Sequence, residues 1–273
     1  MVRRALREDL GKRGDITSRA TIHSDQVDDA VIIARSNGVI AGQRIAEGVF
    51  QSLEQSVQYT IEIPDGENAN TGDTIARIKG KTWAILVGER TALNLLGRCS
   101  GIASLTSQYV KAIEGTNAKI TETRKTAPGL RYIDKASVVT GGGVNHRYAL
   151  YDAFLIKENH IRATGGIVEA IKACQTYRDR YGMFRVMVEA TNIEEYKLAL
   201  SAKPERILLD NMTPDQLTAC VKVTHNNVEL EATGGITLEN VRQYAETGVN
   251  FISIGALTHS VGVLDLSLLI RSL

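Results

Sequence analysis

AKITETRKTAPGLRYIDKASVVTGGGVNHRYALYDAFLIKENHI, from Ala118 to Ile161, is the stretch around which this sequence is organised. It opens with a strand-like run that ends at Arg124-Lys125, and it closes with a second run, Ala153–Ile156, that ends at Lys157. Between Glu122 and Arg162, seven Arg or Lys residues stand against four Asp or Glu residues. Cations clustered at strand ends are typical of a site for a small polyanion, although scattered Lys and Arg more often form a solvated surface. Because Lys157 directly follows a buried-looking run, we favour the site.

Outward from this stretch, apolar runs alternate with helical patterns. The expected strands are Ala118–Thr123, Ala153–Ile156, Arg185–Val188, Ile207–Leu209, Val228–Glu231 and Phe251–Ile254. The expected helices are Gly166–Tyr181, Ile193–Ser201, Pro214–Thr224 and Leu238–Thr247. Two of them begin at capping boxes, Thr191 to Glu194 and Thr213 to Gln216. This alternation predicts parallel strands with right-handed crossovers, and the lack of a dinucleotide-binding glycine fingerprint favours a barrel over an open doubly wound sheet.

The N-terminal part has a different pattern and predicts a small α+β unit. Helices are expected at Val2–Leu10, Ile45–Leu53 and, as a single long helix, Trp83–Ile113. Residues Val27–Ile40 predict two strands joined by a tight hairpin through Ser36-Asn37-Gly38, and Val57–Ile63 alternates like a half-buried strand. In the long helix, Gly97 and Gly101 indicate either a kink or the close approach of another element.

Composition sets the broad class of the protein. With 273 residues, 43% hydrophobic and 23% charged, the chain is expected to be a soluble globular protein with one large core or two smaller ones. A net charge of +1 argues against a non-specific nucleic-acid binder. No apolar run approaches the roughly 18 residues that span a bilayer, and the N-terminus lacks a signal-peptide core. Cys99, Cys174 and Cys220 lack metal-ligand spacing and predict reduced, buried thiols. We therefore expect a cytoplasmic protein that binds neither nucleic acid nor a membrane.

A chemically useful residue follows each apolar run, at the end of the strand where the active sites of such barrels lie. In chain order these residues are Arg124 and Lys125, Lys157, Glu189, Asp210, Thr233-Gly234-Gly235, and Ser253 with Gly255. The late glycine-rich loops offer backbone N–H groups to a phosphate. Glu189 and Asp210 suit a divalent cation such as Mg²⁺ or an electron-deficient carbon, although ion pairs with Lys157 or Arg124 would also account for them. The cations, together with His146-Arg147 after the glycine triplet, are suited to clamp one or more carboxylates.

Longer motifs extend this pattern over nearly the whole chain. In order they are ALREDLGKRGDITS, GERTALNLLGRCSGIAS, TETRKTAPGLR, GGGVNHR, YDAFLIKENHI, VMVEA, ILLDNM, LEATGGIT and ISIGALTHS. Together they resemble the quinolinate phosphoribosyltransferase family (nicotinate-nucleotide pyrophosphorylase, carboxylating), with a departure at Thr233, where serine is common. The resemblance implies an α/β fold of the type II phosphoribosyltransferase kind, with an N-terminal open-faced α/β sandwich over residues 1–115 and an incomplete TIM-like α/β barrel over residues 116–262. We expect residues 263–273 to pack on the first domain.

The resemblance also implies a reaction and a homodimer. Phosphoribosyl would be transferred from phosphoribosyl pyrophosphate to quinolinate in the presence of Mg²⁺, giving nicotinate mononucleotide, pyrophosphate and carbon dioxide in NAD biosynthesis. The implied substrate-binding residues are Arg90, Arg124, Lys125, His146, Arg147 and Lys157 for quinolinate, Thr233, Gly234, Gly235, Ser253 and Gly255 for the 5-phosphate, and Thr123. Because Arg90 lies outside the barrel, we expect it to reach the site of the partner subunit.

Catalysis is assigned to Lys125, Lys157, Glu189 and Asp210. Glu189 and Asp210 would bind Mg²⁺ and stabilise the positive charge that forms on the ribose as pyrophosphate leaves. A preorganised cation in a dry pocket would assist decarboxylation.

Two alternatives remain open. A paralogue of the molybdenum-transport-associated type would have the same fold and an unknown substrate, but the full set of Lys125, His146-Arg147 and Lys157 argues against it. Residues 57–80 resemble a biotinyl or lipoyl carrier hairpin, which would make the protein a non-catalytic carrier module. The tip of that hairpin has Glu67–Asn70 where a carrier has its lysine, so the sequence favours the enzyme.

Overall fold

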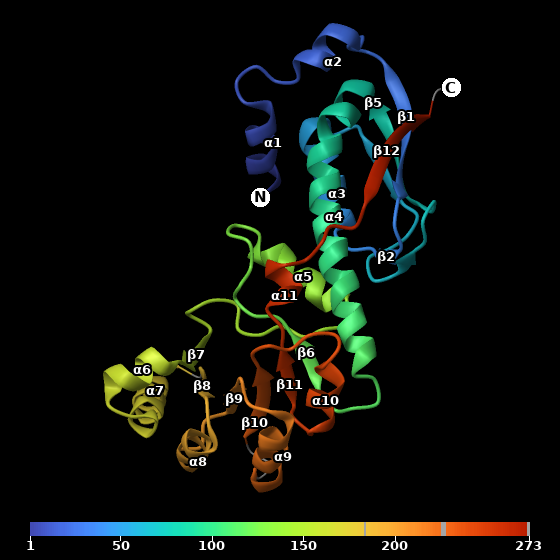
Figure 1. Cartoon of the computed structure of the whole chain (residues 1–273). Helices are drawn as coiled ribbons and strands as arrows, with labels where there is room; N and C mark the ends of the chain where they lie inside the picture. Colours follow the sequence, from blue (N-terminus) through green and yellow to red (C-terminus); the bar gives the residue numbers. More distant parts are fainter. Residues whose placement is uncertain (183, 225–227, 272–273) are drawn as a thin grey trace. The chain divides into compact units, whose positions relative to one another are not determined.

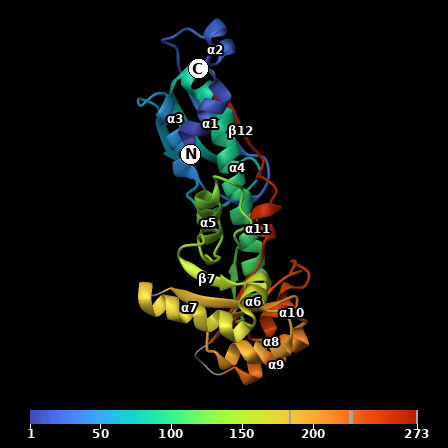
Figure 2. The same cartoon turned by 90° about the vertical axis from the view of Figure 1, so that its left-hand side faces the viewer.

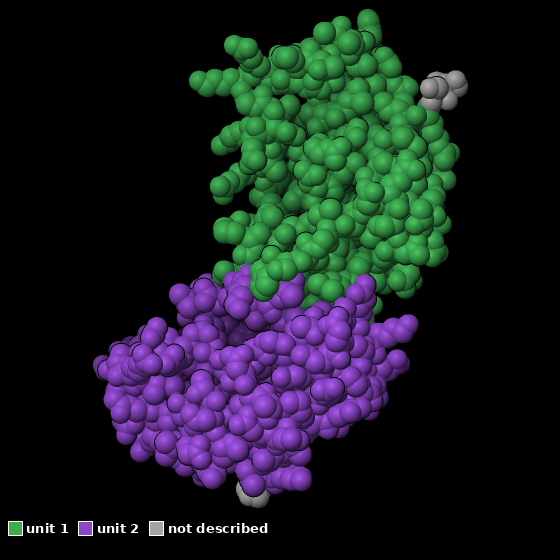
Figure 3. Space-filling view, in the orientation of Figure 1, with its two compact units in different colours: residues 1–107, 126–142, 257–273 green, residues 108–125, 143–256 purple. Residues whose placement is uncertain are grey.

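The computed structural model describes residues 1–182, 184–224 and 228–271, and the chain divides into two compact units (Figure 3). Unit 1 comprises residues 1–107, 126–142 and 257–273, and unit 2 comprises residues 108–125 and 143–256. The sequence places residues 126–142 in the barrel domain, whereas their contacts assign them to unit 1. Each unit is built around its own sheet, and the two sheets differ in strand direction (Figure 1).

Unit 1 contains a 4-stranded antiparallel sheet with the order β12-β1-β5-β3. Its strands are β1 (Val27–Ala34), β3 (Gln58–Ile61), β5 (Thr74–Lys81) and β12 (Leu266–Arg271). Ile32 and Ile78 lie on its apolar face and share one hydrophobic core with residues of helices α3 (Gln43–Leu53) and α4 (Thr82–Ala112). The strand near the C-terminus thus belongs to the same sheet as the first strand of the chain.

The prediction of a tight hairpin within Val27–Ile40 is wrong, because the two strands of this segment do not pair with each other. The two short strands after β1 are β2 (Gly38–Val39) and β4 (Asn68–Ala69). β2 pairs with β4, whereas β1 pairs with β5 and β12. Gly38 instead packs closely on other parts of unit 1, since a Cβ there would lie 2.5 Å from Leu264 Cδ1 and 2.6 Å from Ser104 Oγ. The Asn-Gly signal therefore marks a close long-range contact and not a local turn.

The two glycines of α4 explain how the C-terminal segment packs on this helix. A Cβ at Gly97 would lie 2.9 Å from Leu264 O, and a Cβ at Gly101 would lie 2.1 Å from Gly262 O. Leu264 N–H donates a hydrogen bond of 2.9 Å to Gly97 O. The close approach predicted from Gly97 and Gly101 is therefore confirmed.

This packing predicts the effect of adding one methyl group. We expect Gly101→Ala to lower the free energy of unfolding by about 1–3 kcal/mol, because the backbone around Gly262 must move to make room. Gly48 in α3 is the matched control, because a Cβ there has no neighbour within 4 Å. Gly48→Ala should raise the free energy of unfolding by about 0.5–1 kcal/mol through helix propensity. Denaturant unfolding of both variants measures these changes, and equal stabilities would contradict the packing.

Three further helices of unit 1 are short. They are α1 (Val2–Leu10), α2 (Ile16–Thr21) and α5 (Arg131–Thr140). The first has the predicted bounds. The helix α5 is not predicted from the sequence, because its apolar face is interrupted by a buried acid. Asp134 is fully buried and accepts hydrogen bonds from Arg98 Nε and a terminal guanidinium nitrogen, both at 2.8 Å.

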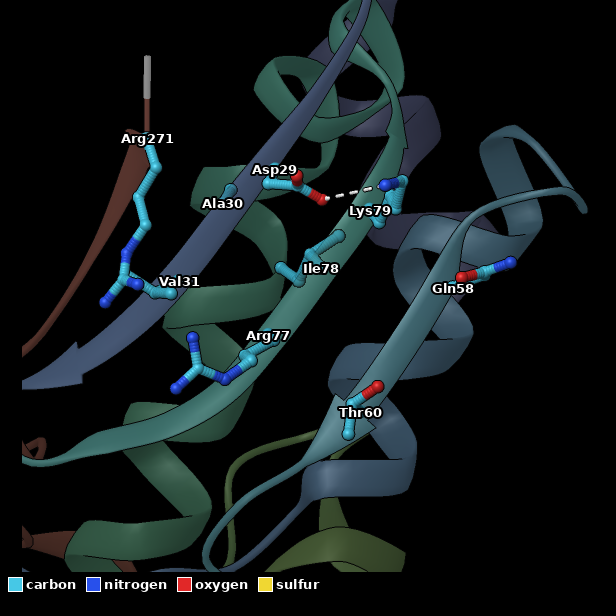
Figure 4. A pocket seen from close by; sticks show the side chains of 9 residues that line it. All are labelled: Asp29, Ala30, Val31, Gln58, Thr60, Arg77, Ile78, Lys79 and Arg271. Atoms are coloured by element: carbon cyan, nitrogen blue, oxygen red, sulfur yellow. Dashed lines mark ion pairs between the residues drawn. The ribbon is translucent and has the colours of Figure 1, made fainter. Parts of the chain in front are cut away.

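The opposite face of the unit 1 sheet is polar. A hollow of about 410 Å³ lies on it, lined by residues of all four strands (Figure 4). Lys79 forms an ion pair of 3.7 Å with Asp29, and Arg77 forms one of 2.6 Å with Glu62. None of the candidate site residues lines this hollow. We interpret it as a solvated, charged sheet face.

Unit 2 contains a 6-stranded sheet with the order β6-β11-β10-β9-β8-β7, and every neighbouring pair is parallel. Its strands are β6 (Lys119–Thr121), β7 (Ala153–Ile156), β8 (Arg185–Ala190), β9 (Arg206–Asp210), β10 (Glu229–Thr233) and β11 (Phe251–Ser253). Each overlaps a predicted strand. The first two strands along the chain, β6 and β7, stand at opposite edges, so the sheet has the strand order of an incomplete barrel, as predicted.

Helices connect these strands. They are α6 (Glu158–Thr164), α7 (Ile167–Tyr181), α8 (Ile193–Ser201), α9 (Pro214–Val223) and α10 (Val241–Glu246). The short helix α11 (Ala256–His259) follows β11, and its residues from Leu257 onward belong to unit 1. Neighbouring helices from α7 to α10 contact one another on the outside of the sheet (Figure 2). No helix in residues 1–182, 184–224 or 228–271 has an apolar stretch long enough to cross a bilayer.

One of the two predicted capping boxes is confirmed and the other is displaced. Thr213 Oγ1 accepts from Gln216 N–H at 3.4 Å, and the Gln216 side chain accepts from Thr213 N–H at 2.9 Å. At α8, however, the N-cap is Asn192 and not Thr191, because Asn192 Oδ1 accepts from Glu195 N–H at 2.9 Å. The Asn192 side chain therefore caps the first turn of α8 one residue later than predicted.

The three cysteines are free thiols in α4, α7 and α9. Cys99 and Cys220 are buried, as predicted, whereas Cys174 is half-buried. Burial raises the pKa of the Cys99 and Cys220 thiols to about 11. Both are therefore protonated and unreactive near neutral pH.

Candidate active site

The register of the parallel sheet places several candidate residues on one face. Thr233 lies opposite Asp210 on one side and opposite Ser253 on the other. Glu189 lies opposite Leu208, which is two residues before Asp210. Because residues two apart in a strand point to the same side, Glu189, Asp210, Thr233 and Ser253 share one face at the carboxyl ends of their strands. The edge predicted for the site is therefore a continuous row of polar side chains.

Lys157 and Glu189 meet across β7 and β8 as an ion pair. Lys157 follows Ile156, which lies opposite Val188, so the register brings the two charged residues next to each other. The Lys157 side chain is 50% exposed and that of Glu189 is 19% exposed. Solvent screens such a pair, which therefore adds little to stability and leaves the ammonium group accessible. The ion pair considered as an alternative for Glu189 is present, and it joins two residues of the candidate site.

Arg124 and Arg147 bring two guanidinium groups together. Arg147 donates a hydrogen bond of 3.0 Å to Ala153 O at the start of β7. Burial, and after it the positive charge of Arg124, lowers the pKa of Arg147. Arg124 Nε is buried and has no hydrogen-bond partner among the described residues. A carboxylate bound between these groups would reduce their repulsion and give Arg124 Nε an acceptor.

Lys125 and Thr123 complete the loop after β6. Lys125 is exposed, and its backbone N–H donates to Thr123 Oγ1 at 3.1 Å. This hydrogen bond closes a turn directly after β6, and the turn contains Arg124. It explains a short polar residue at position 123.

His146 is 9% exposed and lies in a loop attached to β6. Its backbone N–H donates to Glu122 Oε1 at 3.1 Å, and its ring Nδ1 accepts from Arg147 N–H at 2.8 Å. The ring Nε2 lies 3.5 Å from Glu231 Oε1. The structure thus brings His146 and Arg147 to the same strand edge as Arg124.

The loop after β10 has the backbone shape that requires glycine. Gly234 and Gly235 have positive φ angles of 89° and 63°. A Cβ at Gly234 would lie 2.2 Å from Asn211 Oδ1, whereas one at Gly235 would meet nothing within 4 Å. Asn211 itself has φ 56° and donates its N–H to Thr233 O at 2.9 Å. Loops that expose successive backbone N–H groups can form concave sites for anions.

Of the two glycine loops, only the one after β11 leads directly into a helix. α11 begins at Ala256, directly after Gly255. α10 begins only at Val241, because Asn240 first closes a turn by accepting from Thr237 N–H at 2.8 Å and donating to Gly235 O at 3.1 Å. A phosphate near Gly234 would therefore contact loop amides and not a helix N-terminus.

The carboxylates of Glu189 and Asp210 fit a cation that is bound together with the substrate. Among the described residues, no group of three or more His, Cys, Asp and Glu side chains is arranged to hold a metal ion. Mg²⁺ in sites that handle phosphates is commonly bound by one or two carboxylates together with substrate oxygens. Glu189 and Asp210 end neighbouring strands on one face and fit that pattern.

Arg90 lies on α4 in unit 1. Its side chain is 68% exposed and is 4.0 Å from the Glu89 carboxylate. Such an exposed helical arginine is available for a ligand or for a partner subunit. Its assignment to the site remains a prediction.

Sequence reasoning missed three buried charged residues beneath this edge: Glu122, Arg206 and Glu231. Arg206 donates to Glu231 Oε2 at 2.8 Å and to Glu229 Oε2 at 2.9 and 3.0 Å. Its guanidinium also lies over the Phe251 ring, 3.6 Å from the centroid. Strands buried on both faces are usually continuous apolar runs. The two glutamates at alternate positions of β10, Glu229 and Glu231, were therefore a signal of polar contacts within the sheet.

Comparison with known proteins identifies the family. Residues 15–100 match the family model of the quinolinate phosphoribosyl transferase N-terminal domain, and residues 102–269 match that of the C-terminal domain. The chain is 43% identical to a probable carboxylating nicotinate-nucleotide pyrophosphorylase of Bacillus subtilis, over 96% of this chain and 89% of that protein. It is 41% identical to the carboxylating nicotinate-nucleotide pyrophosphorylase of Mycobacterium leprae, over 98% of this chain and 95% of the other.

Solved structures of nicotinate-nucleotide pyrophosphorylases have the same fold as this chain. The nicotinate-nucleotide pyrophosphorylase of Francisella tularensis superposes with a TM-score of 0.93 at 37% identity, covering 99% of this chain and 94% of that one. That of Ehrlichia chaffeensis superposes with a TM-score of 0.92 at 38% identity, covering 99% and 97%. With both of its domains matched by the family models, the chain belongs to the quinolinate phosphoribosyltransferase family.

Proposed function

We propose that the protein transfers phosphoribosyl from phosphoribosyl pyrophosphate to quinolinate and releases carbon dioxide, forming nicotinate mononucleotide. The observation that carries this proposal is the group of cations that flank the parallel strands β6 and β7: Arg124 after β6, Arg147 bonded to Ala153 O on β7, and Lys157 after β7. Lys157 stands at the end of β7, to which Arg147 is anchored, and pairs with Glu189. Two adjacent carboxylates on one aromatic ring are a ligand that matches several cations at once.

Each part of the site has a role in this reaction. As the bond between ribose C1 and pyrophosphate breaks, positive charge grows on the ribose, and Glu189 and Asp210 are suited to stabilise it. Mg²⁺, bound with the substrate, would neutralise charge on the pyrophosphate leaving group. The quinolinate nitrogen takes the ribose carbon and becomes positively charged. The bond from ring carbon 2 to its carboxylate then breaks, its electron pair stays on the ring, and that carbon takes up a proton.

The cations have a second role during carbon dioxide loss. The carboxylate that is retained must be held while negative charge builds on the ring. Lys125 and Lys157 are exposed, whereas Arg124 and Arg147 are half-buried. We assign orientation of quinolinate to the arginines and charge stabilisation to the lysines. Thr233, Ser253 and the amides of Gly234, Gly235 and Gly255 would bind the 5-phosphate.

The assembly and the location belong to the same proposal. We infer a cytoplasmic homodimer in which Arg90 of one subunit reaches the quinolinate site of the other. The exposure of Arg90, 68% of its side chain, supports this arrangement.

Ligand charge tests the proposed function directly. Calorimetric titration should show that quinolinate binds at least about 30-fold more tightly than nicotinate, because the mono-acid leaves part of the cation set unpaired, at a cost of about 2 kcal/mol. Phosphoribosyl pyrophosphate with Mg²⁺ serves as the control ligand and should bind well to the same preparation. Equal affinities for the two pyridine acids would contradict the proposal.

A further inference from the structure

A chain of buried polar groups runs beneath the proposed quinolinate site. Glu231 is fully buried on β10, and one of its oxygens accepts a hydrogen bond of 2.8 Å from Arg206. Its other oxygen, Oε1, accepts no hydrogen bond among the described residues and lies 3.5 Å from His146 Nε2. A buried carboxylate needs charged or hydrogen-bonding partners. Arg206 is such a partner for one oxygen, and the His146 ring is the polar group that lies beside the other.

The two ring nitrogens of His146 have different partners. Nδ1 accepts the backbone N–H of Arg147 at 2.8 Å, so Nδ1 cannot itself carry the proton. The ring proton therefore lies on Nε2, on the side of Glu231. The second partner of a histidine sets its tautomer in the same way at metal sites.

Both nitrogens of His146 thus face protein atoms, and the ring is 9% exposed. The residue next to it, Arg147, is different. Its guanidinium donates to Ala153 O and lies close enough to Arg124 for the two charges to affect each other. His146 is therefore placed to act on the ligand through Arg147.

We propose that Glu231 is a positioning residue for quinolinate binding. Arg206 holds the Glu231 carboxylate, whose negative charge 3.5 Å from His146 Nε2 favours the Nε2–H tautomer. Nδ1 then accepts the Arg147 backbone N–H and so orients Arg147. The inference rests on the proposed function, because the ligand oriented by Arg147 is quinolinate. Glu231 itself contacts no substrate.

Glu231→Gln tests this role with little change in volume. If the amide oxygen faces Arg206, the amide N–H group faces His146 Nε2 and favours the Nδ1–H tautomer, which conflicts with the Arg147 N–H. We expect the KM for quinolinate to rise about tenfold, while the KM for phosphoribosyl pyrophosphate stays within about twofold. Glu229→Gln is the matched control, since Glu229 also bonds Arg206 but is 36% exposed. It should leave both KM values within about twofold.

A double-mutant cycle separates positioning from general destabilisation. Adding Glu231→Gln to a His146→Ala background should not raise the KM for quinolinate by more than about twofold, because the tautomer no longer matters. A full tenfold effect in that background would overturn the proposal. So would an unchanged quinolinate KM in the single Glu231→Gln variant.

Nitrogen-15 NMR of the histidine rings provides a test that needs no variant at Glu231. The His146 signal, assigned by its loss in His146→Ala, should show the Nε2–H tautomer in the wild-type protein. An Nδ1–H tautomer would overturn the proposal even if Glu231→Gln fails to fold. If the wild-type enzyme does not turn over quinolinate, the proposed function fails, whereas an active enzyme with the wrong tautomer refutes only this inference.

Discussion

Arg147→Ala is expected to weaken quinolinate binding by about 100-fold, since truncating one partner of a desolvated charge pair commonly costs about 2–5 kcal/mol. Arg147 is partly buried beside Arg124, so solvent would not replace its contacts with a carboxylate. Lys157→Ala should have an effect of similar size for another reason. Its loss leaves the Glu189 carboxylate without its cation, facing a dianion. Both variants should bind phosphoribosyl pyrophosphate within about threefold of wild type.

Asp210→Asn should affect the chemical step and leave quinolinate binding unchanged, the opposite of the Arg147 and Lys157 variants. Asp210 lies two strands away from Lys157, in the row with Thr233 and Ser253. We expect kcat or its Mg²⁺ dependence to change while the Kd for quinolinate stays within about threefold. Calorimetry with each ligand and steady-state kinetics measure this division.

Arg162→Ala is the control within the same basic stretch. Its side chain is 73% exposed and pairs with Glu158 on the same helix, so neither ligand should bind differently. Equal loss of both ligands in the Arg147, Lys157 and Asp210 variants, with folding intact, would show that these residues form a structural ion-pair network.

The second large effect concerns sharing of the site between subunits. Arg90→Ala and Lys157→Ala homodimers should each be nearly inactive if Arg90 of one subunit serves the site that contains Lys157 of the other. A mixed heterodimer would then have one site with both lesions and one with neither. It should regain up to about half of the wild-type activity per dimer.

The heterodimer experiment needs proof that subunits have exchanged. Differently tagged variants, co-purified through both tags, provide it. If the exchanged dimer has no activity, Arg90 acts within its own chain or only in folding. Arg90→Lys homodimers, which keep the charge but lose the planar fork, should retain partial activity.

The sequence correctly predicted those helices and strands that are determined by residues close together in the chain. The apolar run Ala153–Ile156 matches β7 in full, and the Thr213 box marks the start of α9. The prediction of a hairpin at Asn37-Gly38 was wrong, because Gly38 packs against Leu264 and Ser104, which are more than 60 residues away in the chain. Patterns within a short window cannot report such contacts.

The same division holds for the site. Positions after strands predicted Lys157 and Glu189, because parallel strands bring their ends together at one edge. The support beneath the site was not predicted, since the partners of His146 are Glu122, directly after β6, and Glu231 on β10, and only the fold brings these residues together. Glu122 and Glu231 are thus positioned by topology.

The central claim is that the clustered cations bind a dicarboxylate which then receives phosphoribosyl and loses one carboxylate. Purified protein should be incubated with phosphoribosyl pyrophosphate, Mg²⁺ and quinolinate that is radiolabelled in the carboxylate on ring carbon 2. We expect labelled carbon dioxide and nicotinate mononucleotide in equal amounts, and no release of labelled carbon dioxide when phosphoribosyl pyrophosphate is omitted. No turnover of quinolinate, or turnover of nicotinate with equal efficiency, would contradict it.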